Sequence, residues 1–315
     1  MGPSNVSSRL AIVGLVGLVA LDVVLVGLAL RSNHSSGIDT SPVTSANPSP
    51  STSSPSVTSS PAETVTATTA PATPAAPLRT VLVALDNQSA WRISVGSCAA
   101  GGATLATTTD GGKTWADAKA PLRTIVPVRP TDSKAAFVIG ADSNCAAGIR
   151  STTNGGGTWG SAGDVRGAWF RDPKNTKTVG APGPSTSQPC GERAVLDLAV
   201  ISTSSARVLC ADGLVRSTTN AASSWTDSGT VTGAVALAVL PANPAQSYVA
   251  RLGAPNCAGV QILRVGQSTG TACVQTALPK DPGQIALSLV NGGGWLAVAN
   301  TTMRSTDALV TWSVS

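Results

Sequence analysis

Charged and aromatic residues are scarce in this 315-residue chain. Charged residues make up 12% and aromatic residues 3% of it, and the only histidine is His34. Because His34 precedes the strand-rich part of the sequence, that part has no imidazole for a Ser-His-Asp triad, a Cys-His nucleophile or a histidine-ligated metal. Lys and Arg are scattered singly although the formal net charge is +5, which indicates no nucleic-acid-binding surface.

Sequence motifs for cofactors are also absent. The chain has no phosphate-binding loop, no dinucleotide-binding fingerprint and no EF-hand spacing. Scattered aspartates fall on predicted turns, where a turn-forming role is commoner than a calcium site. We therefore predict no cofactor, no metal and no catalytic residues.

One long apolar run lies near the N-terminus. Residues 10–30 are apolar except for Asp22 and are long enough to cross a bilayer as a helix. We expect residues 1–9 to be cytoplasmic, this run to be a single-pass anchor in the cell membrane, and the rest to be extracytoplasmic. A cleaved signal peptide is the alternative, although its apolar region usually covers only ~7 to 15 residues. Asp22 is a candidate for pairing with a partner helix. The alternative, equally open, is that the membrane tolerates Asp22 in its protonated form.

A segment poor in charge follows the apolar run. Residues 31–77 consist mainly of Ser, Thr, Pro, Ala and Val. Such a composition buries too little apolar surface to offset the entropy of ordering. We expect a disordered, Pro/Ser/Thr-rich linker that holds the following domain away from the membrane.

An octapeptide recurs four times in the C-terminal part. In each copy a Ser or Thr stands two residues before an Asp or Asn, and a Trp follows that Asp or Asn by five residues. The copies are TTDGGKTW ending at Trp115, TTNGGGTW ending at Trp159, TTNAASSW ending at Trp225 and STDALVTW ending at Trp312. The hydroxyl and the Asp or Asn bind nearby backbone groups, and Gly-Gly supplies positive φ, so each copy predicts a tight turn.

The pattern S/T-x-D-x-G-x-T-W resembles the Asp-box, or BNR, repeat, and the resemblance extends as an architecture over residues 80–315. In that family the box closes the hairpin between the third and fourth strands of a β-propeller blade, away from the ligand face. The resemblance thus implies structural roles for eight residues: Asp110, Trp115, Asn154, Trp159, Asn220, Trp225, Asp307 and Trp312. An Ala-, Gly- and Val-rich composition with more Arg than Lys is typical of a bacterial member.

Longer units surround the octapeptides. Each copy follows an apolar strand, a polar turn and a second alternating strand, which is the pattern of an antiparallel hairpin. These hairpins span 80–98, 124–145, 194–213 and 284–303, and a further one at 234–257 has no octapeptide. A shortened unit fits the gap at 166–193. Units of ~40 to 45 residues are blade-sized. We predict an all-β fold over 78–315, a β-propeller of five or six four-stranded blades, with an open solenoid or a sandwich as the alternative.

All six cysteines lie in this strand-rich region. An even number outside the membrane indicates three disulfides, for which six cysteines allow 15 connectivities. We expect Cys98 to pair with Cys145, Cys190 with Cys210, and Cys257 with Cys273. A zinc site is the alternative, but no C-x-x-C pair supports it.

The function implied by the resemblance is broad. Asp-box propellers include sialidases, sortilin-type receptors, xyloglucanases and photosystem assembly factors. A sialidase-like hydrolase needs a tyrosine nucleophile and a glutamate, and the region offers only Tyr248 and Glu192, neither in a sialidase-like motif. We predict a membrane-anchored, non-catalytic module that binds a protein or a cell-envelope glycan. A glycoside hydrolase and an envelope assembly factor are the alternatives.

Overall fold

The computed structural model describes residues 76–182 and 186–315, which lie in one compact unit, Ala67–Ser315. The predicted membrane anchor at 10–30, with its Asp22, and nearly all of the predicted linker lie outside the described residues. Among the residues described, no helix is both long and apolar enough to cross a membrane.

The described residues form six antiparallel sheets, numbered here as blades 1 to 6 in chain order. Blade 1 holds β1 (Thr80–Ala84), β2 (Ala90–Ser94), β3 (Thr104–Thr108) and β4 (Ala116–Ala118); blade 2 holds β5 (Thr124–Pro130), β6 (Ala136–Ala141) and β7 (Ala147–Thr152); blade 3 holds β8 (Phe170–Arg171), β9 (Val179–Gly180) and β10 (Thr186–Ser187). Blade 4 holds β11 (Val195–Val200), β12 (Ala206–Cys210), β13 (Leu214–Thr218) and β14 (Thr226–Thr230); blade 5 holds β15 (Ala234–Leu240), β16 (Asn243–Arg251), β17 (Val260–Arg264) and β18 (Ala272–Val274); blade 6 holds β19 (Ile285–Val290), β20 (Gly293–Val298), β21 (Thr301–Ser305) and β22 (Ser313–Val314). A 3-10 helix, η1 (Pro282–Gln284), precedes β19.

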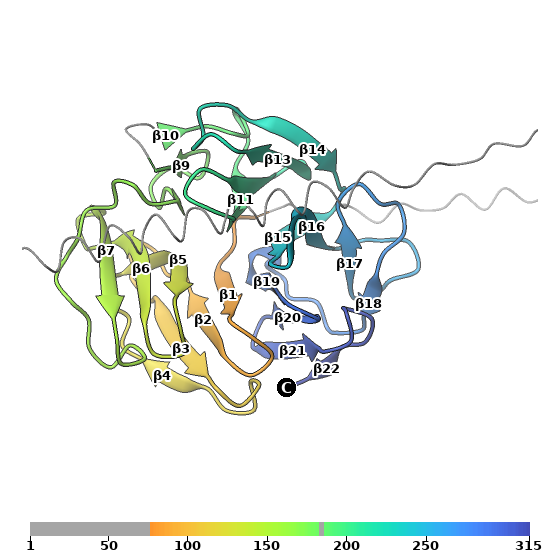
Figure 1. Ribbon diagram of the computed structural model, residues 1–315, viewed down its shortest axis with the longest axis horizontal. Coiled ribbons are helices and arrows are strands. Elements are labelled where there is room, and N and C mark those ends of the chain that lie inside the picture. The colour runs from red at the N-terminus through yellow and green to blue at the C-terminus, as the bar shows by residue number, and fades with distance from the viewer. Residues whose placement is uncertain (1–75, 183–185) are drawn as a thin grey trace, which may run out of the picture. The chain divides into compact units, whose positions relative to one another are not determined.

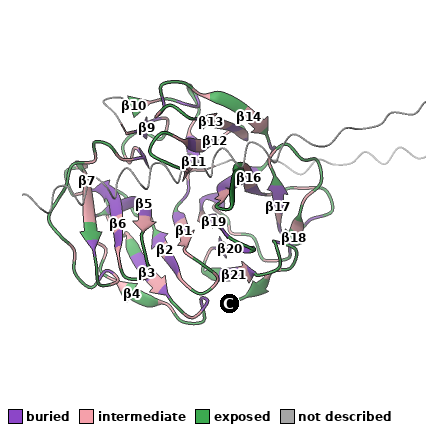
Figure 2. Ribbon diagram, in the orientation of Figure 1, coloured by how far each residue is buried: buried purple, intermediate pink, exposed green. Residues whose placement is uncertain are grey.

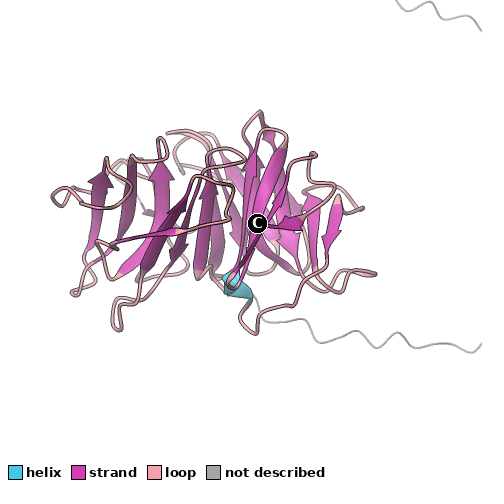
Figure 3. Ribbon diagram, turned by 90° about the horizontal axis from the view of Figure 1, so that it is seen from below, coloured by secondary structure: helices cyan, strands magenta, loops and turns pink. Residues whose placement is uncertain are grey.

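The six blades close into a ring around their first strands. β1 contacts β5, and contacts continue through β8, β11, β15 and β19 back to β1 (Figure 1). The strands run between two loop-bearing faces, and η1 lies at one of them (Figure 3). Each sheet consists of consecutive strands, so the last blade meets the first through side chains and not through a shared strand. The predicted propeller is therefore confirmed, with six blades.

Two blades depart from the predicted four strands. In blade 2 the fourth position is occupied by a glycine-rich segment that makes only an isolated bridge, Ile149 with Gly163, and one further bond from the Gly160 N–H to the Ser151 oxygen at 2.8 Å. Glycine weakens a strand because it offers no side chain to pack. Blade 3 has three strands of two residues each, which confirms the shortened unit predicted at 166–193.

The core is distributed over the junctions between blades. The outermost strands are more exposed than the first strands (Figure 2); in blade 6, for example, β19 is largely buried and β22 is exposed. Six hydrophobic clusters each join two neighbouring blades, and members from the two sides are Ile93 and Ile125 (blades 1 and 2), Ile139 and Phe170 (2 and 3), Val179 and Val208 (3 and 4), Leu209 and Leu263 (4 and 5), Ile262 and Leu287 (5 and 6), and Trp295 and Leu82 (6 and 1). Burying each such side chain stabilises the fold by about 1.5–3 kcal/mol.

The four octapeptides form turns that follow the third strand of their blade, and in blades 1, 4 and 6 these turns lead into the fourth strand. In the first copy the Thr108 hydroxyl donates to the Asp110 carboxylate at 2.8 Å and accepts from the Gly112 N–H at 3.0 Å. The Thr114 hydroxyl donates to the other carboxylate oxygen at 2.6 Å. Asp307 makes the same bonds in the fourth copy. Asn154 and Asn220 also accept from the hydroxyl two residues earlier, but each donates its amide N–H to the hydroxyl four residues later.

A second bond ties each octapeptide turn to another turn of its own blade. The residue after the Asp or Asn donates its backbone N–H to a carbonyl in the turn between the first and second strands. The four bonds, at 2.7–2.9 Å, join Gly111 to Gln88, Gly155 to Lys134, Ala221 to Ser204 and Ala308 to Gly292. The Asp and Asn side chains are thus engaged within their own turns.

Acid should weaken the two Asp-containing turns. Hydrogen bonds from the threonines at 114 and 311 lower the pKa of Asp110 and of Asp307 to about 2. The unfolded value is about 3.9, so their stabilising contribution is complete above pH ~4 and is lost as the pH falls toward 2. A double variant, Asp110→Asn with Asp307→Asn, should fold, since Asn holds the same place in two other copies, and should lose less stability in that window.

The measurement is the urea midpoint at pH 5 and at pH 2 for both proteins. Equal losses in the parent and in the variant would mean that these two carboxylates contribute nothing to the acid sensitivity of the fold.

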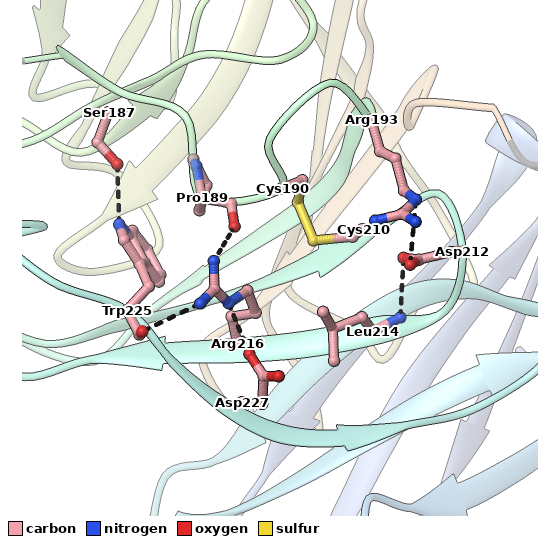
Figure 4. Close-up of a disulfide and its surroundings, with 10 residues drawn as sticks. All are labelled: Ser187, Pro189, Cys190, Arg193, Cys210, Asp212, Leu214, Arg216, Trp225 and Asp227. Atoms are coloured by element: carbon pink, nitrogen blue, oxygen red, sulfur yellow. Dashed lines mark hydrogen bonds and ion pairs between the residues drawn. A yellow bond between two sulfur atoms is a disulfide. The ribbon is translucent and has the colours of Figure 1, made fainter.

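Two disulfides are formed, and both pairings agree with those expected from the sequence. Cys190–Cys210 joins the segment after β10 in blade 3 to β12 in blade 4, and Cys257–Cys273 lies within blade 5. Figure 4 shows that Arg216, Trp225 and the ion pair Arg193–Asp212 surround the first of them. The Trp225 indole donates to Ser187, and Arg216 donates to the Pro189 carbonyl, so both side chains also reach blade 3.

The expected third pair, Cys98 with Cys145, is not formed, and both residues are thiols. Each thiol lies in a loop fixed by its own bonds: Arg123 donates to the Cys98 carbonyl, and Asp142 accepts from the Ala146 N–H. Desolvation and a hydrogen bond with the Cys145 thiol raise the pKa of Cys98 to about 11. Because the thiolate is the reactive form, this keeps Cys98 protonated.

Removing the disulfide between blades 3 and 4 should cost stability, because the short strands of blade 3 supply few ladder bonds. The two cysteines are 20 residues apart, and we expect Cys190→Ser with Cys210→Ser to lower the free energy of unfolding by about 3 kcal/mol. Urea titration measures this loss in the free energy of unfolding. Limited proteolysis should then cut the variant first within blade 3, whereas Cys257→Ser with Cys273→Ser should leave blade 3 protected. If both double variants were cut first in blade 5, the Cys190–Cys210 disulfide would not be what protects blade 3.

Candidate functional site

The first strands enclose a cavity of about 200 Å³ at the centre of the ring. Its walls come from β1, β11, β15 and β19 and are mainly aliphatic, as expected where apolar inner strands converge. Ala199 and Leu287 are examples of this lining. Two charged side chains, Arg129 and Asp197, also face the cavity. A concave, mostly apolar space with few polar groups is the usual form of a ligand site.

A narrower cavity of about 30 Å³ adjoins the central one and shares Arg129 and Asp197 with it. Arg171 is the third charged side chain that lines it. Arg129 comes from β5, Arg171 from β8 and Asp197 from β11, so blades 2, 3 and 4 each contribute one charge. We call these three residues the charged cluster.

Asp197 is held by backbone amides on both oxygens. A register shift after Val195 in β11 turns its side chain, which is only 9% exposed, inward. Oδ1 accepts from the Leu198 N–H at 2.7 Å, and Oδ2 accepts from the Leu237 N–H of β15 at 2.8 Å. Burial raises the pKa of Asp197, and the Arg171 guanidinium and these amides act against that rise. The carboxyl group therefore also joins blade 4 to blade 5.

The two arginines of the cluster have few partners. Arg171 is 8% exposed and donates one hydrogen bond, to the Leu78 carbonyl at 3.4 Å. Half-buried Arg129 donates to the adjacent Val128 carbonyl at 3.3 Å. Within residues 76–182 and 186–315, neither arginine forms an ion pair with Asp197. Burial lowers the pKa of both arginines, for Arg129 to about 10, so Arg129 stays charged at neutral pH.

Polar cavities also lie on the outside of the ring, where blades 1 and 6 meet. Two of them, of about 150 and 310 Å³, share Arg92 and Asn300. The Arg92 guanidinium stacks 4.4 Å from the centre of the Trp115 ring and donates to the Thr302 hydroxyl at 3.1 Å. Arg92 is therefore already engaged in joining the two blades, unlike the arginines of the charged cluster.

The residues considered for hydrolysis lie elsewhere. The Tyr248 hydroxyl, in β16, donates to Gln246, and Glu192 pairs with Lys177 at 2.7 Å on the surface. Neither residue lines the central cavity, and none of the eight octapeptide residues does. No group of three or more metal-ligating side chains is present in the part of the chain that the structure describes.

The charged cluster was not predicted from the sequence. A signal was nevertheless present, because Asp197 interrupts the apolar run AVLDLAV and Arg129 directly follows the largely apolar run TIVPV. A charge within an otherwise buried strand requires a partner or a function.

No family model and no curated protein matches the chain. Among solved structures, YCF48 bound to D1 peptide is 17% identical over 77% of this chain and 67% of its own, with a TM-score of 0.29. The GH74 enzyme of Niastella koreensis is 16% identical over 74% of this chain and 46% of its own, with a TM-score of 0.41. A six-bladed lectin from Aleuria aurantia is 10% identical over 75% of this chain and 93% of its own, with a TM-score of 0.45. At such identities the likeness concerns the fold alone.

Proposed function

We propose that this chain is an Asp-box propeller anchored in the cell membrane by residues 10–30, with its ring outside the cytoplasm. There it binds a protein or a cell-envelope glycan without catalysis. The anchor and its orientation rest on the apolar run and the Ser/Thr/Pro-rich segment after it. The family assignment is supported by the hydrogen bonds that recur in all four octapeptide turns.

The central cavity is the observation that carries the binding proposal. It combines aliphatic walls with a few charged groups, and one of these, Arg129, keeps most of its donors free of protein partners. A ligand seated there contacts first strands of several blades at once, which is how a rigid ring presents a preformed site.

The single carboxyl group of the cavity favours binding over hydrolysis. A glycosidase needs two carboxyl groups about 5 to 10 Å apart, or a tyrosine with a glutamate. Among the residues that the structure describes, Asp197 is the only acidic one that lines either central cavity. Its two oxygens already accept backbone N–H bonds, which leaves it poorly placed to take or give a proton.

The test is a binding screen with the full-length chain in detergent against a glycan array and an envelope extract. Ala199→Phe, which places a ring in the cavity, is compared with Ala116→Phe at an exposed position of the outer strand β4. We expect a ligand that is retained by the parent and by the outer variant but lost by Ala199→Phe, with both variants melting near the parent. Equal retention by all three proteins would contradict a site in the cavity.

A further inference from the structure

We propose that Arg129 and Arg171 form a seat for the carboxylate of the ligand, at the narrow end of the central cavity. This inference rests on the proposed function and specifies the chemistry of the bound group.

The cluster carries excess positive charge. Two guanidinium groups face one carboxyl group, so the formal charge is at least +1 whether or not Asp197 is ionised. No other ionisable side chain lines either of the two cavities. A buried charge is costly unless it is paired, and folding has already removed these guanidinium groups from most of their water. An anion that binds them therefore adds little further cost for desolvating the arginines.

Both guanidinium groups retain unused donors that face the cavity. A guanidinium has five N–H donors. Arg171, although more than nine-tenths buried, donates one bond to protein among the described residues, and Arg129 also donates one. The planar fork of arginine matches a carboxylate, with two parallel N–H to oxygen bonds.

Size and charge favour a carboxylate over a phosphate. The narrow cavity of about 30 Å³ admits a small planar group, whereas the adjoining space of about 200 Å³ takes the body to which that group is attached. With Asp197 ionised the cluster charge is +1, which a monoanion balances, while a phosphate dianion would leave a buried negative charge beside Asp197. Both the C-terminus of a peptide and a sugar acid carry such a group.

Matched probe pairs test the inference with the full-length chain in neutral detergent. N-acetylalanine is compared with N-acetylalaninamide, and glucuronate with glucose, by calorimetry at low salt. We expect at least one acid to bind at least ten-fold more tightly than its neutral counterpart, because the carboxylate gains charge-assisted hydrogen bonds that the neutral group cannot make. The acid that binds identifies a peptide or a sugar source. If neither acid is preferred over its neutral counterpart, the inference is wrong.

Three substitutions connect the preference to the cluster. Arg129→Met should weaken binding of the acid at least ten-fold, and Asp197→Asn should strengthen it, because the cluster charge then rises. Arg166→Met, which removes the same charge from an exposed loop, should have no effect. Thermal melting confirms that each variant is folded. Arg129 is chosen over Arg171 because it is only half-buried, so its substitution should disturb the fold less.

The outcome is independent of the binding screen. If the ligand found there is lost by Ala199→Phe but retained unchanged by Arg129→Met, the cavity binds its ligand and the carboxylate seat is refuted. If the acids bind through Arg129 but Ala199→Phe leaves the screened ligand bound, the seat holds and the proposed site of that ligand fails.

Discussion

Replacing Trp295 with alanine is expected to lower the free energy of unfolding by about 3–5 kcal/mol and to loosen the contact between blades 6 and 1. The indole is fully buried in the cluster that joins these blades. Its Nε1 donates to the Asp86 carbonyl of blade 1 at 2.8 Å, and its ring packs edge-on against Trp115 at 6.4 Å. Because no strand is shared between the first and last blades, these side chains close the ring.

Trp312→Ala is the matched control, since it removes the same side chain from the same blade. Trp312 is half-buried, and its Nε1 donates within its own blade to Leu309 at 3.2 Å. Urea titration followed by circular dichroism measures both variants. A loss for Trp295→Ala no larger than that for Trp312→Ala would show that the ring does not depend on this junction.

Asp197→Ala is expected to destabilise the chain by about 3–5 kcal/mol, the usual cost of removing one partner from a buried charged group. The change leaves Arg171 beside an apolar side chain and leaves the backbone N–H groups of Leu198 and Leu237 without acceptors. Since these partners belong to blades 3, 4 and 5, the loss should appear as a lower urea midpoint for the whole ring and not as local fraying.

Asp197→Asn separates the loss of hydrogen bonds from the loss of charge. The amide keeps an oxygen acceptor for one backbone N–H, so we expect a clearly smaller loss than for alanine. Equal losses for Asp197→Asn and Asp197→Ala would mean that the missing charge accounts for the whole destabilisation. A loss below about 1 kcal/mol for Asp197→Ala would mean that the cluster does not stabilise the ring.

Local features of the fold could be predicted from the sequence. The contacts of Asp110 lie within four residues along the chain, so the octapeptide alone fixes the turn. Cys257 and Cys273 lie 16 residues apart within one blade, and that short separation favours their pairing. The alternation of apolar and polar residues in strands such as AWRIS likewise indicates which face is buried.

Features that depend on several blades could not be predicted. Arg129, Arg171 and Asp197 are distant in sequence and meet only because three first strands converge on the centre. The strands of blade 3 are too short for a periodic pattern. Cys98 and Cys145 follow second strands at equivalent positions, which suggested a disulfide; the two thiols are neighbours joined by a hydrogen bond and not by an S–S bond.

A crystal structure of the chain with the ligand retained in the binding screen tests the central claim most directly. The account predicts ligand density in the cavity lined by Ala199 and Leu287, with a carboxylate within hydrogen-bond reach of Arg129 and Arg171. Ligand density on the octapeptide turns or along the outer strands β4, β14 and β22, with none in the central cavity, would contradict it.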